Sequence, residues 1–572
     1  MTYKENKIIC NPLNLMYRYQ IREIRKKHHV FREAADPTMI LHNDKYLLFC
    51  SMSGGFWYSD DMYDWKFHET PELPIYDYAP DVRLINGRIV FSASKIGGKC
   101  RFYVSSDPLH EPFAPLEEAF PWWDPHLFQD EDGSVYFYWG CSTKPLKGIR
   151  LDPETLKPMG KKKLLIGGNP DKYGWERRGE NNVATKPVNF MGFVFNLLMG
   201  KGPFIEGAYM TKYNGRYYLQ YAAPGTEYNV YSDGVYVGDD PLGPFTYQPH
   251  NPFSSVPGGF ITGAGHGSTF QDKNGKWWHI TTMRISVNEN FERRIGLFPC
   301  DFDSDGILHC EQELADYPFD VESGTKTDLM LLDGEPSAST FQPGFEPEKG
   351  CNEDVRSWWA ADDNSDEQWF RLDLGGSKTV CAVQINFADH QMDAPEDLIK
   401  RQHKTILGGR TICITHKKIG YILECSENGI DWSILHDTRT NETDYCHDFI
   451  VLGEPSKARY LKLSHMTLPF NGVPAISGLR VFGYGNGPKP AQVQAIKGEH
   501  IGHLNIQLSW KDAVGATRYN VRYGIAPEKL YSSWQTPNNS LNLSTITTGE
   551  TYYAAVDSIN ENGITPGEIV RL

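Results

Sequence analysis

Three acidic residues occupy matching positions in repeated segments of the chain. Asp124 and Glu206 each lie eight residues before an Asp-Gly or Asn-Gly turn signal. Asp36 lies seven to eight residues before Asn43-Asp44, the pair at the corresponding turn of the first repeat. Hydrolysis of a glycosidic bond commonly needs one carboxylic acid that protonates the leaving oxygen and one carboxylate that activates water or attacks the sugar. A third carboxylate nearby raises the pKa of the acid by like-charge repulsion. Three converging acids therefore favour glycoside hydrolysis, whereas one acid before proline more often starts a turn.

The same acids could instead hold a metal ion, since Ca²⁺ accepts carboxylate oxygens. The corresponding position of the fifth repeat is His266, which is a poor ligand for a hard cation. A calcium-loop lookalike, "DFDSDGILHCEQ", begins at Asp301, but its twelfth residue is Gln312 where such a loop needs a bidentate glutamate. We therefore predict a hairpin turn at Asp301, and hydrolysis is the better interpretation of the three acids.

Five turn signals, each followed by a β-prone strand, divide the first half of the chain into repeats. Asn-Gly and Asp-Gly are the strongest short hairpin signals, and the five turns begin at Asn43, Asn86, Asp132, Asn214 and Asn274. Repeats at this spacing indicate a solenoid or a propeller. Strands throughout and five units predict a five-bladed β-propeller, in which equivalent positions near the axis converge on one funnel.

Residues 30–320 resemble glycoside hydrolase family 43, a family of five-bladed propellers that contains inverting exo- and endo-glycosidases. The resemblance rests on the ordered motifs "ADPTMI", "YAPDV", "DPHLFQDEDG", "IEGAYM", "GHGS" and "ERRIGLFPCDFDSDG". It implies that Asp36 is the general base that activates water and that Glu206 is the general acid. It also implies that Asp124 raises the pKa of the acid and orients it. The acid motif reads Glu-Gly-Ala where the family usually has Glu-Gly-Pro, but the glutamate is kept.

The resemblance also implies residues that bind the sugar. Tyr78 stands where the family often has tryptophan, and Arg293 matches a substrate-holding arginine, with Arg294 as its adjacent competitor. His266 matches an axial histidine that neighbours a bound cation in some relatives. The resemblance therefore implies no cofactor for the chemistry, but it allows a structural Ca²⁺ at the propeller axis, near His266.

Aromatic side chains suit the C–H faces of sugar rings. Trp57, on a first-repeat strand, is predicted to contact substrate, with packing between blades as the alternative. Strand alternation predicts that one of Trp122 and Trp123 points inward, and Trp123 is the substrate-binding candidate. The long insert at residues 142–203 is expected to build one wall of the pocket, where Glu176 could touch substrate or lie in a solvated loop.

The second half of the chain predicts two further β-domains after a propeller domain at residues 1–325. Residues 326–486 resemble the factor V/VIII type C, or discoidin-like, domain, a jelly-roll β-sandwich, on "WFRLDLGG", "SENGIDW" and "ARYLKL". Residues 487–572 resemble a fibronectin type III domain and are expected to act as a spacer or brace. The predicted fold class is thus all-β. The discoidin-like domain could bind carbohydrate or prop the propeller, and the polar stretch 388–418 has the composition of a loop insertion without an assigned role.

Composition narrows the function classes. The formal net charge of the 572 residues is −15 and no long Lys/Arg stripe occurs, which argues against nucleic acid as a partner. No apolar run of about 18 residues predicts a membrane span. The 11 cysteines form no CxxC pair, which excludes a zinc framework of that type. The start "MTYKENKIIC" lacks an apolar leader, so we expect a secreted, periplasmic or cell-surface protein with its leader removed, or alternatively a cytoplasmic one.

The primary hypothesis is an inverting exo-glycosidase that removes terminal α-L-arabinofuranosyl or β-D-xylosyl residues from plant polysaccharides or oligosaccharides. A related furanosidase or galactosidase activity is a neighbouring alternative. A non-catalytic carbohydrate-binding or scaffold protein is the second hypothesis, and the presence of all three acids weakens it. A third is a retaining propeller enzyme that hydrolyses fructosides or transfers glycosyl groups. An inverting pair requires the Asp36 and Glu206 carboxyls to lie roughly 6.5–9.5 Å apart, against about 5 Å for a retaining pair.

Overall fold

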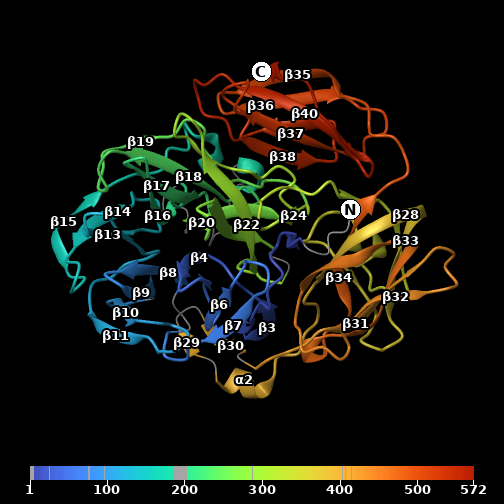
Figure 1. The fold of residues 1–572 in the computed structure, drawn as a ribbon, viewed down its shortest axis with the longest axis horizontal. Coiled ribbons are helices and arrows are strands. Elements are labelled where there is room, and N and C mark those ends of the chain that lie inside the picture. The colour runs from blue at the N-terminus through green and yellow to red at the C-terminus, as the bar shows by residue number, and fades with distance from the viewer. Residues whose placement is uncertain are drawn as a thin grey trace.

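The structure is a computed structural model that describes residues 6–24, 26–74, 78–95, 97–183, 202–285, 288–401, 403–405, 408–413 and 415–572. Within these ranges nearly all of the regular secondary structure is β-strand, and the one α-helix is the short α2 (Glu396–Lys400). The all-β prediction is therefore confirmed. Figure 1 shows a propeller in blue to green, a second group of sheets in yellow to orange, and a third in red.

Five four-stranded antiparallel sheets, with their strands in chain order, form the first half of the chain. They are β4 (Thr38–His42), β5 (Lys45–Phe49), β6 (Gly55–Ser59) and β7 (Lys66–Glu69); β8 (Tyr78–Ile85), β9 (Arg88–Ser94), β10 (Arg101–Ser105) and β11 (Ala114–Glu118); β12 (His126–Gln129), β13 (Val135–Trp139), β14 (Lys147–Leu151) and β15 (Pro158–Leu164); β16 (Glu206–Tyr213), β17 (Arg216–Ala223), β18 (Ser232–Gly238) and β19 (Phe245–Tyr247); and β20 (Thr262–Gln271), β21 (Trp277–Arg284), β22 (Arg293–Phe302) and β23 (Leu308–Cys310). The first strand of each sheet contacts the first strand of the next, and β20 contacts β4. The five sheets therefore close into the predicted five-bladed propeller (Figure 1).

Each predicted turn joins the first two strands of a blade. Asn43, Asn86 and Asn214 have φ values of 47°, 48° and 47°, in the left-handed region that asparagine tolerates and that tight hairpins require. In the other two turns Gly133 and Gly275 have positive φ, at 83° and 79°. The turn residues thus set the register in which the innermost strand of each blade meets its neighbour.

Further sheets occupy the second half. One contains β25 (Met330–Leu331), β26 (Glu335–Ala338), β27 (Trp359–Ala360), β28 (Trp369–Phe387), β31 (Gly420–Ser426), β32 (Ser433–Asp437), β33 (His447–Thr467) and β34 (Ala475–Tyr484); the last two contain β35 (Gln494–Gly502), β36 (Asn505–Lys511) and β39 (Ser540–Leu543), and β37 (Arg518–Gly524), β38 (Ser532–Thr536), β40 (Tyr553–Asn560), β41 (Gly563–Thr565) and β42 (Val570–Arg571). We call the β25–β34 part the sandwich region. The proposed boundaries at 325 and 486 fall between β24 (Phe319–Asp320) and β25, and between β34 and β35. The likeness of these regions to discoidin-like and fibronectin type III domains stays a prediction.

Two pairings join the N-terminal segment to later parts of the chain. β1 (Ile8–Ile9) pairs with β24. β2 (Tyr19–Ile24) and β3 (Lys27–Arg32) form a sheet with β29 (His403–Thr405) and β30 (Gly408–Ile412), in the order β29-β30-β2-β3. The 388–418 stretch therefore reaches from the sandwich region to the propeller, and Figure 1 shows β29 and β30 beside β3.

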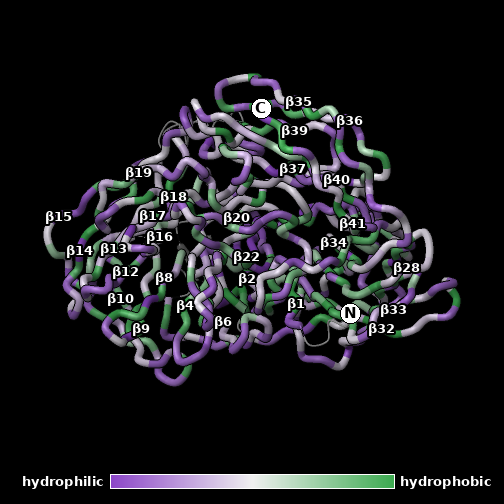
Figure 2. Tube along the Cα trace, turned by 45° about the horizontal axis from the view of Figure 1, so that its top comes forward, coloured by the Kyte–Doolittle hydropathy of each residue, from purple (hydrophilic) through white to green (hydrophobic). Residues whose placement is uncertain are grey.

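The core continues from the propeller into the sandwich region. One cluster of buried residues contains Trp57 and Trp278 of the propeller and Trp359 and Phe370 of the sandwich region. Figure 2 shows hydrophobic stretches within the strands and hydrophilic stretches at many outer turns. All 11 cysteines are free thiols, most of them buried. No helix of the described residues combines the length and the apolar character that a membrane crossing would need.

The calcium-loop lookalike at Asp301 is the turn between β22 and β23, as predicted. Lys529, from the last region of the chain, places its Nζ 2.8 Å from Oδ2 of Asp303 and also pairs with Asp305. Tyr531 donates a hydrogen bond to the same Asp303 oxygen at 2.8 Å. The acidic turn therefore binds a lysine of the chain and helps to join the propeller to the C-terminal sheets.

Candidate active site

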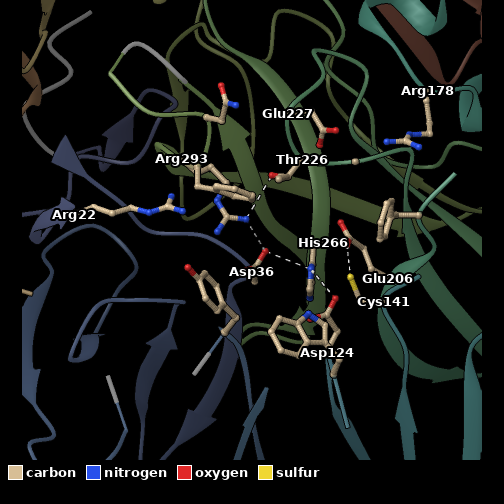
Figure 3. Close-up of a pocket in the computed structure, with 16 residues that line it drawn as sticks. Arg22, Asp36, Asp124, Cys141, Arg178, Glu206, Thr226, Glu227, His266 and Arg293 are labelled. Atoms are coloured by element: carbon tan, nitrogen blue, oxygen red, sulfur yellow. Dashed lines mark hydrogen bonds and ion pairs between the residues drawn. The ribbon is translucent and has the colours of Figure 1, made fainter. Parts of the chain in front are cut away.

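A cavity of about 420 Å³ opens at the axis of the propeller. Its lining comes from all five blades and from two flanking segments (Figure 3), namely Arg22, Asp36, Tyr78, Trp123, Asp124, Cys141, Arg178, Phe204, Glu206, Gly225, Thr226, Glu227, His266, Asn290, Phe291 and Arg293. The three acids predicted from the repeats therefore face one space, although they are separated by up to 170 positions in the sequence.

A left-handed residue lies just before the innermost strand or within its first half in every blade. The five residues are Asp36, Ala79, Asp124, Gly207 and His266, with φ values of 50°, 49°, 49°, 61° and 54°. Such values are uncommon for residues other than glycine and cluster at functional sites, where the surrounding structure holds them. In three blades the left-handed residue itself (Asp36, Asp124 or His266) lines the cavity, and in the other two the residue just before it, Tyr78 or Glu206, does so.

Side chains of the preceding blade hold these kinks in place. In four blades a hydroxyl or carboxylate oxygen accepts the backbone N–H of the left-handed residue at 2.7–2.8 Å, and the pairs are Asp36 with Thr282, Ala79 with Ser51, Asp124 with Ser94, and His266 with Asp233. A buried N–H without such a partner would lose the free energy of a hydrogen bond. In these four blades the kink is thus held by the blade before it.

Asp36 is held as a carboxylate. It is 6% exposed, accepts a hydrogen bond from the Ser51 hydroxyl at 2.6 Å, and lies 3.3 Å from Nη1 of Arg293 and 3.3 Å from Nδ1 of His266. Burial by itself would raise the pKa of Asp36, but Arg293, His266 and the hydrogen bond from Ser51 outweigh it and hold the pKa below its ordinary value. An ionised carboxylate facing the cavity can take a proton from water.

Asp124 and Glu206 form a close acidic pair. A ligand atom of each, together with Sγ of Cys141, lies within 4.8 Å of the others. Glu206 accepts hydrogen bonds from the Tyr231 hydroxyl at 2.6 Å and from the Cys141 thiol at 2.9 Å. Burial raises the pKa of Asp124 to about 7, opposed by His266 and assisted by the charges of Glu206 and Asp36. Asp124 therefore keeps its proton up to about neutral pH, next to the carboxyl of Glu206.

His266 lies between the two kinds of carboxylate. Its Nδ1 is 3.3 Å from Oδ1 of Asp36 and 3.9 Å from Oδ2 of Asp124 (Figure 3). Burial lowers the pKa of His266, but the surrounding carboxylates outweigh burial and raise it above the ordinary value. The imidazole thus stands between the base and the acidic pair, and the raised pKa favours its positive form there.

The predicted Ca²⁺ beside His266 stays a prediction. Within the described ranges, the group with three metal-ligating atoms close together is Asp124, Cys141 and Glu206. Ca²⁺ takes roughly six to eight oxygen ligands and a thiol is a soft ligand, so this donor set does not fit calcium. We assign no chemical step to a metal.

The remaining predicted binding residues separate into two groups. Tyr78, Trp123 and Arg293 line the cavity, and the rings of Tyr78 and Trp123 stack with centroids 6.4 Å apart. Trp122 is instead buried, with Nε1 donating to the carbonyl of Ala93 at 2.9 Å. Arg294, the competitor of Arg293, is 1% exposed and lies outside the cavity. Its Nε donates to Nε2 of His447 at 2.9 Å, so Arg294 joins the propeller to the sandwich region.

The prediction that Trp57 contacts substrate is wrong. Trp57 is 1% exposed and packs edge-on against Phe67 at a centroid distance of 5.0 Å, within the core shared with the sandwich region. The physical reason is its position on β6, the third strand from the axis, where side chains pack between sheets and do not reach the cavity. The alternative of packing between blades describes its environment.

Glu176 neither lines the cavity nor lies in a solvated loop. It is 0% exposed and accepts a hydrogen bond from the Tyr221 hydroxyl at 2.6 Å. Of the 142–203 insert, Arg178 lines the cavity, and residues 184–201 fall outside the described part of the chain. The insert thus contributes Arg178 to the cavity wall, whereas Glu176, the candidate taken from the sequence, does not line the cavity.

Sequence reasoning missed the residues that support the acids. A signal for some of them exists, because counting eight residues downstream from three of the turns reaches Ser51, Ser94 and Thr282, the hydroxyls that hold the kinks. Tyr231 and Cys141, which donate to Glu206, have no such regular spacing. They are visible only once the blades are assembled.

The matches with known proteins concern the propeller. Residues 30–308 match the family model of glycosyl hydrolases family 43, a class of glycosidases. The chain is similar to a beta-xylosidase of Xylanibacter ruminicola, with 29% identity over 28% of this chain and 51% of the relative. It is also similar to the xylosidase/arabinosidase 43A of Humicola insolens, with 30% identity over 32% of this chain and 60% of the relative. The chain therefore spans about half to three fifths of the length of these relatives.

Solved structures are similar at lower identity. A mutant of a GH43 protein from Bacillus licheniformis is 14% identical, with a TM-score of 0.40 over 98% of this chain and 91% of that chain. The assignment of the fold rests on the closed ring of five sheets described above.

Proposed function

We propose that the protein is an inverting exo-glycosidase that releases terminal α-L-arabinofuranosyl or β-D-xylosyl residues from plant polysaccharides or oligosaccharides. The observation that carries this proposal is the convergence of Asp36, Asp124 and Glu206 from three blades on one cavity of about 420 Å³. The family match of residues 30–308 and the printed names of the relatives, xylosidase and arabinosidase, support the sugar class.

In the proposed reaction Asp36 accepts a proton from a water molecule, and the oxygen of that water forms a bond to the anomeric carbon. The bond between the anomeric carbon and the glycosidic oxygen breaks, and Glu206 donates its proton to that oxygen. Asp124 keeps a proton available on the acidic pair, since two adjacent carboxylates resist losing both protons. The products are the free sugar with inverted configuration and the shortened glycan.

The remaining lining residues have roles in binding. The stacked rings of Tyr78 and Trp123 offer an apolar surface to the C–H face of a sugar. Arg293 holds Asp36 from one side, and Arg178 stands across the cavity from Arg22 (Figure 3). We propose that these walls admit the end of a glycan. The carboxyl separation that an inverting pair requires stays a prediction.

The decisive experiment is the configuration of the first product. NMR during hydrolysis of p-nitrophenyl α-L-arabinofuranoside and β-D-xyloside should show the inverted anomer before mutarotation. Asp36→Asn should lower kcat by about 10²- to 10⁴-fold, the range for loss of a general base. A retained anomer would assign the site to the retaining class. If the protein binds glycans but hydrolyses neither of these probes nor a p-nitrophenyl galactoside, a carbohydrate-binding protein would be favoured.

A further inference from the structure

A buried arginine from the second half of the chain reaches the wall of the propeller cavity. Arg410 lies on β30, within the 388–418 stretch, and is 6% exposed. Its Nη1 donates to the hydroxyl of Tyr78, and its guanidinium carbon lies 5.4 Å from the centroid of the same ring. An aromatic residue that lines the cavity is therefore held by a side chain from outside the propeller.

Glu33 extends this contact toward the base. It is 0% exposed and accepts hydrogen bonds from Nη2 of Arg410 at 3.0 Å and from Nη2 of Arg293 at 2.7 Å. Arg293 in turn donates from Nη1 to Oδ1 of Asp36 at 3.3 Å. Since a buried carboxylate needs compensation by charge and hydrogen bonds, Glu33 fixes both guanidinium groups relative to each other. An unbroken row of charge contacts thus runs from Arg410 to Asp36.

The pairing of β30 with β2 sets the direction of Arg410. In this antiparallel pair Arg22 lies opposite Arg410, and Gln20 lies opposite Ile412. Gln20 is itself fixed, because its Nε2 donates to the carbonyl of Met52 at 3.1 Å. A slip of one residue would turn Arg410 to the other face of the sheet. The register therefore specifies that this arginine faces Tyr78 and Glu33.

We propose that Arg410 is a positioning residue for the active site: it fixes Tyr78 at the cavity wall and, through Glu33, holds Arg293 against Asp36. The kinetic readout of this inference rests on the proposed glycosidase function. The inference gives a role to the 388–418 stretch, which then makes the sandwich region a structural part of the active site, in contrast to an appended binding module.

The kinetic test is Arg410→Met in the full chain. We expect kcat/KM to fall by about 10- to 100-fold, since small misplacements of catalytic groups cost up to roughly 10²-fold. In this variant Glu33 draws Arg293 away from Asp36, so the negative charge of Asp36 is less compensated and the pKa of Asp36 rises. The acid limb of the kcat/KM profile should therefore move to higher pH. The other charged and titratable groups that face Asp36 stay in place, namely His266, Asp124, Cys50 and Tyr231. Arg410→Lys should recover part of the loss, because lysine is a point charge without the planar fork.

Arg480→Met is the matched control. Arg480 is also a fully buried cation of the sandwich region, and its Nη2 lies 3.2 Å from Oδ2 of Asp316. It lies outside the cavity lining, so its loss should lower thermal stability and leave the acid limb in place. If Arg410→Met and Arg480→Met lower activity equally and neither moves the acid limb, Arg410 is only a structural link and the inference is overturned.

A second readout does not depend on turnover. Hydrogen–deuterium exchange of the Tyr78–Ile85 strand should become faster in Arg410→Met and stay as in the wild type in Arg480→Met. If the wild type hydrolyses no probe glycoside, the proposed function fails, while this exchange still tests the role of Arg410. Exchange of β8 that is identical in the wild type and Arg410→Met would overturn the inference.

Discussion

Two clusters of buried charge, one at the propeller axis and one where the propeller meets the sandwich region, use the same residue types in different arrangements. At the axis Asp124 and Glu206 approach each other and face a cavity. At the contact Nη2 of Arg32 lies 2.9 Å from Asp444 and 3.7 Å from Asp389, and Arg32 is 0% exposed. At the propeller axis, carboxyl groups of like charge lie together beside a cavity. Where the propeller meets the sandwich region, opposite charges are paired, and these residues lie outside the cavity lining.

A raised pKa does not distinguish the two clusters. Burial raises the pKa of Asp124 to about 7 at the axis, and it raises the pKa of Glu292 to about 7 at the contact although Arg294 opposes the shift. Burial also raises the pKa of Glu176 to about 7, away from both clusters. What separates a candidate active site from a structural ion cluster here is the cavity and the convergence of acids from separate blades.

The strongest test of this difference substitutes two glutamates, Glu206, which lines the cavity, and Glu176, which is buried away from it. Glu206→Gln should lower kcat by about 10²- to 10⁴-fold on glycosides with poor leaving groups, and less on p-nitrophenyl glycosides, whose leaving group needs little protonation. Glu176→Gln is the control, because Glu176 is buried with a raised pKa but faces no cavity. Its kcat should stay near that of the wild type. Equal losses in both variants, or undiminished turnover in Glu206→Gln, would remove the assignment of the acid.

The contact cluster should affect stability and leave the chemistry unchanged. Arg32→Met leaves Asp444 and Asp389 buried without their cation, which should lower the free energy of unfolding by about 3–5 kcal/mol. Arg459→Met, which breaks a partly exposed pair with Asp373, should change the free energy of unfolding far less, because solvent screens that pair. Denaturant unfolding measures both changes. A displaced pH profile of kcat/KM in Arg32→Met would show that the two clusters are coupled.

The smallest expected effect is a displacement of the pH profile. Activity requires Asp36 without a proton and one proton on the Asp124–Glu206 pair. It should therefore be lost as the pH falls through the lowered pKa of Asp36, and as the pH rises through about 7. Asp124→Asn removes the like charge, so the basic limb of kcat/KM should move to lower pH while the acid limb changes little. A basic limb that stays in place would exclude Asp124 as the group that retains the proton.

The sequence predicted the propeller because its determinants are local. A tight hairpin needs particular residues at its turn. Asn86 and Asn214 therefore predict the first two strands of their blades from the local sequence alone. Constant spacing then places Asp36, Asp124 and Glu206 at equivalent positions. The prediction that Trp57 contacts substrate was wrong because it depended on a non-local property. The pattern of a strand does not show how far that strand lies from the propeller axis.

Repetition of turns and acids along the chain therefore determined the fold class of the first half and three residues of the candidate site. Apart from the regularly spaced hydroxyls of Ser51, Ser94 and Thr282, the partners that surround these acids are decided only by the assembled structure. The Arg410–Tyr78 bond joins residues 332 positions apart, and Tyr231 reaches Glu206 from the segment just before β18 in the same blade. Contacts such as the Arg410–Tyr78 bond depend on how whole sheets pack, and packing between distant segments leaves no periodic trace in the order of the residues.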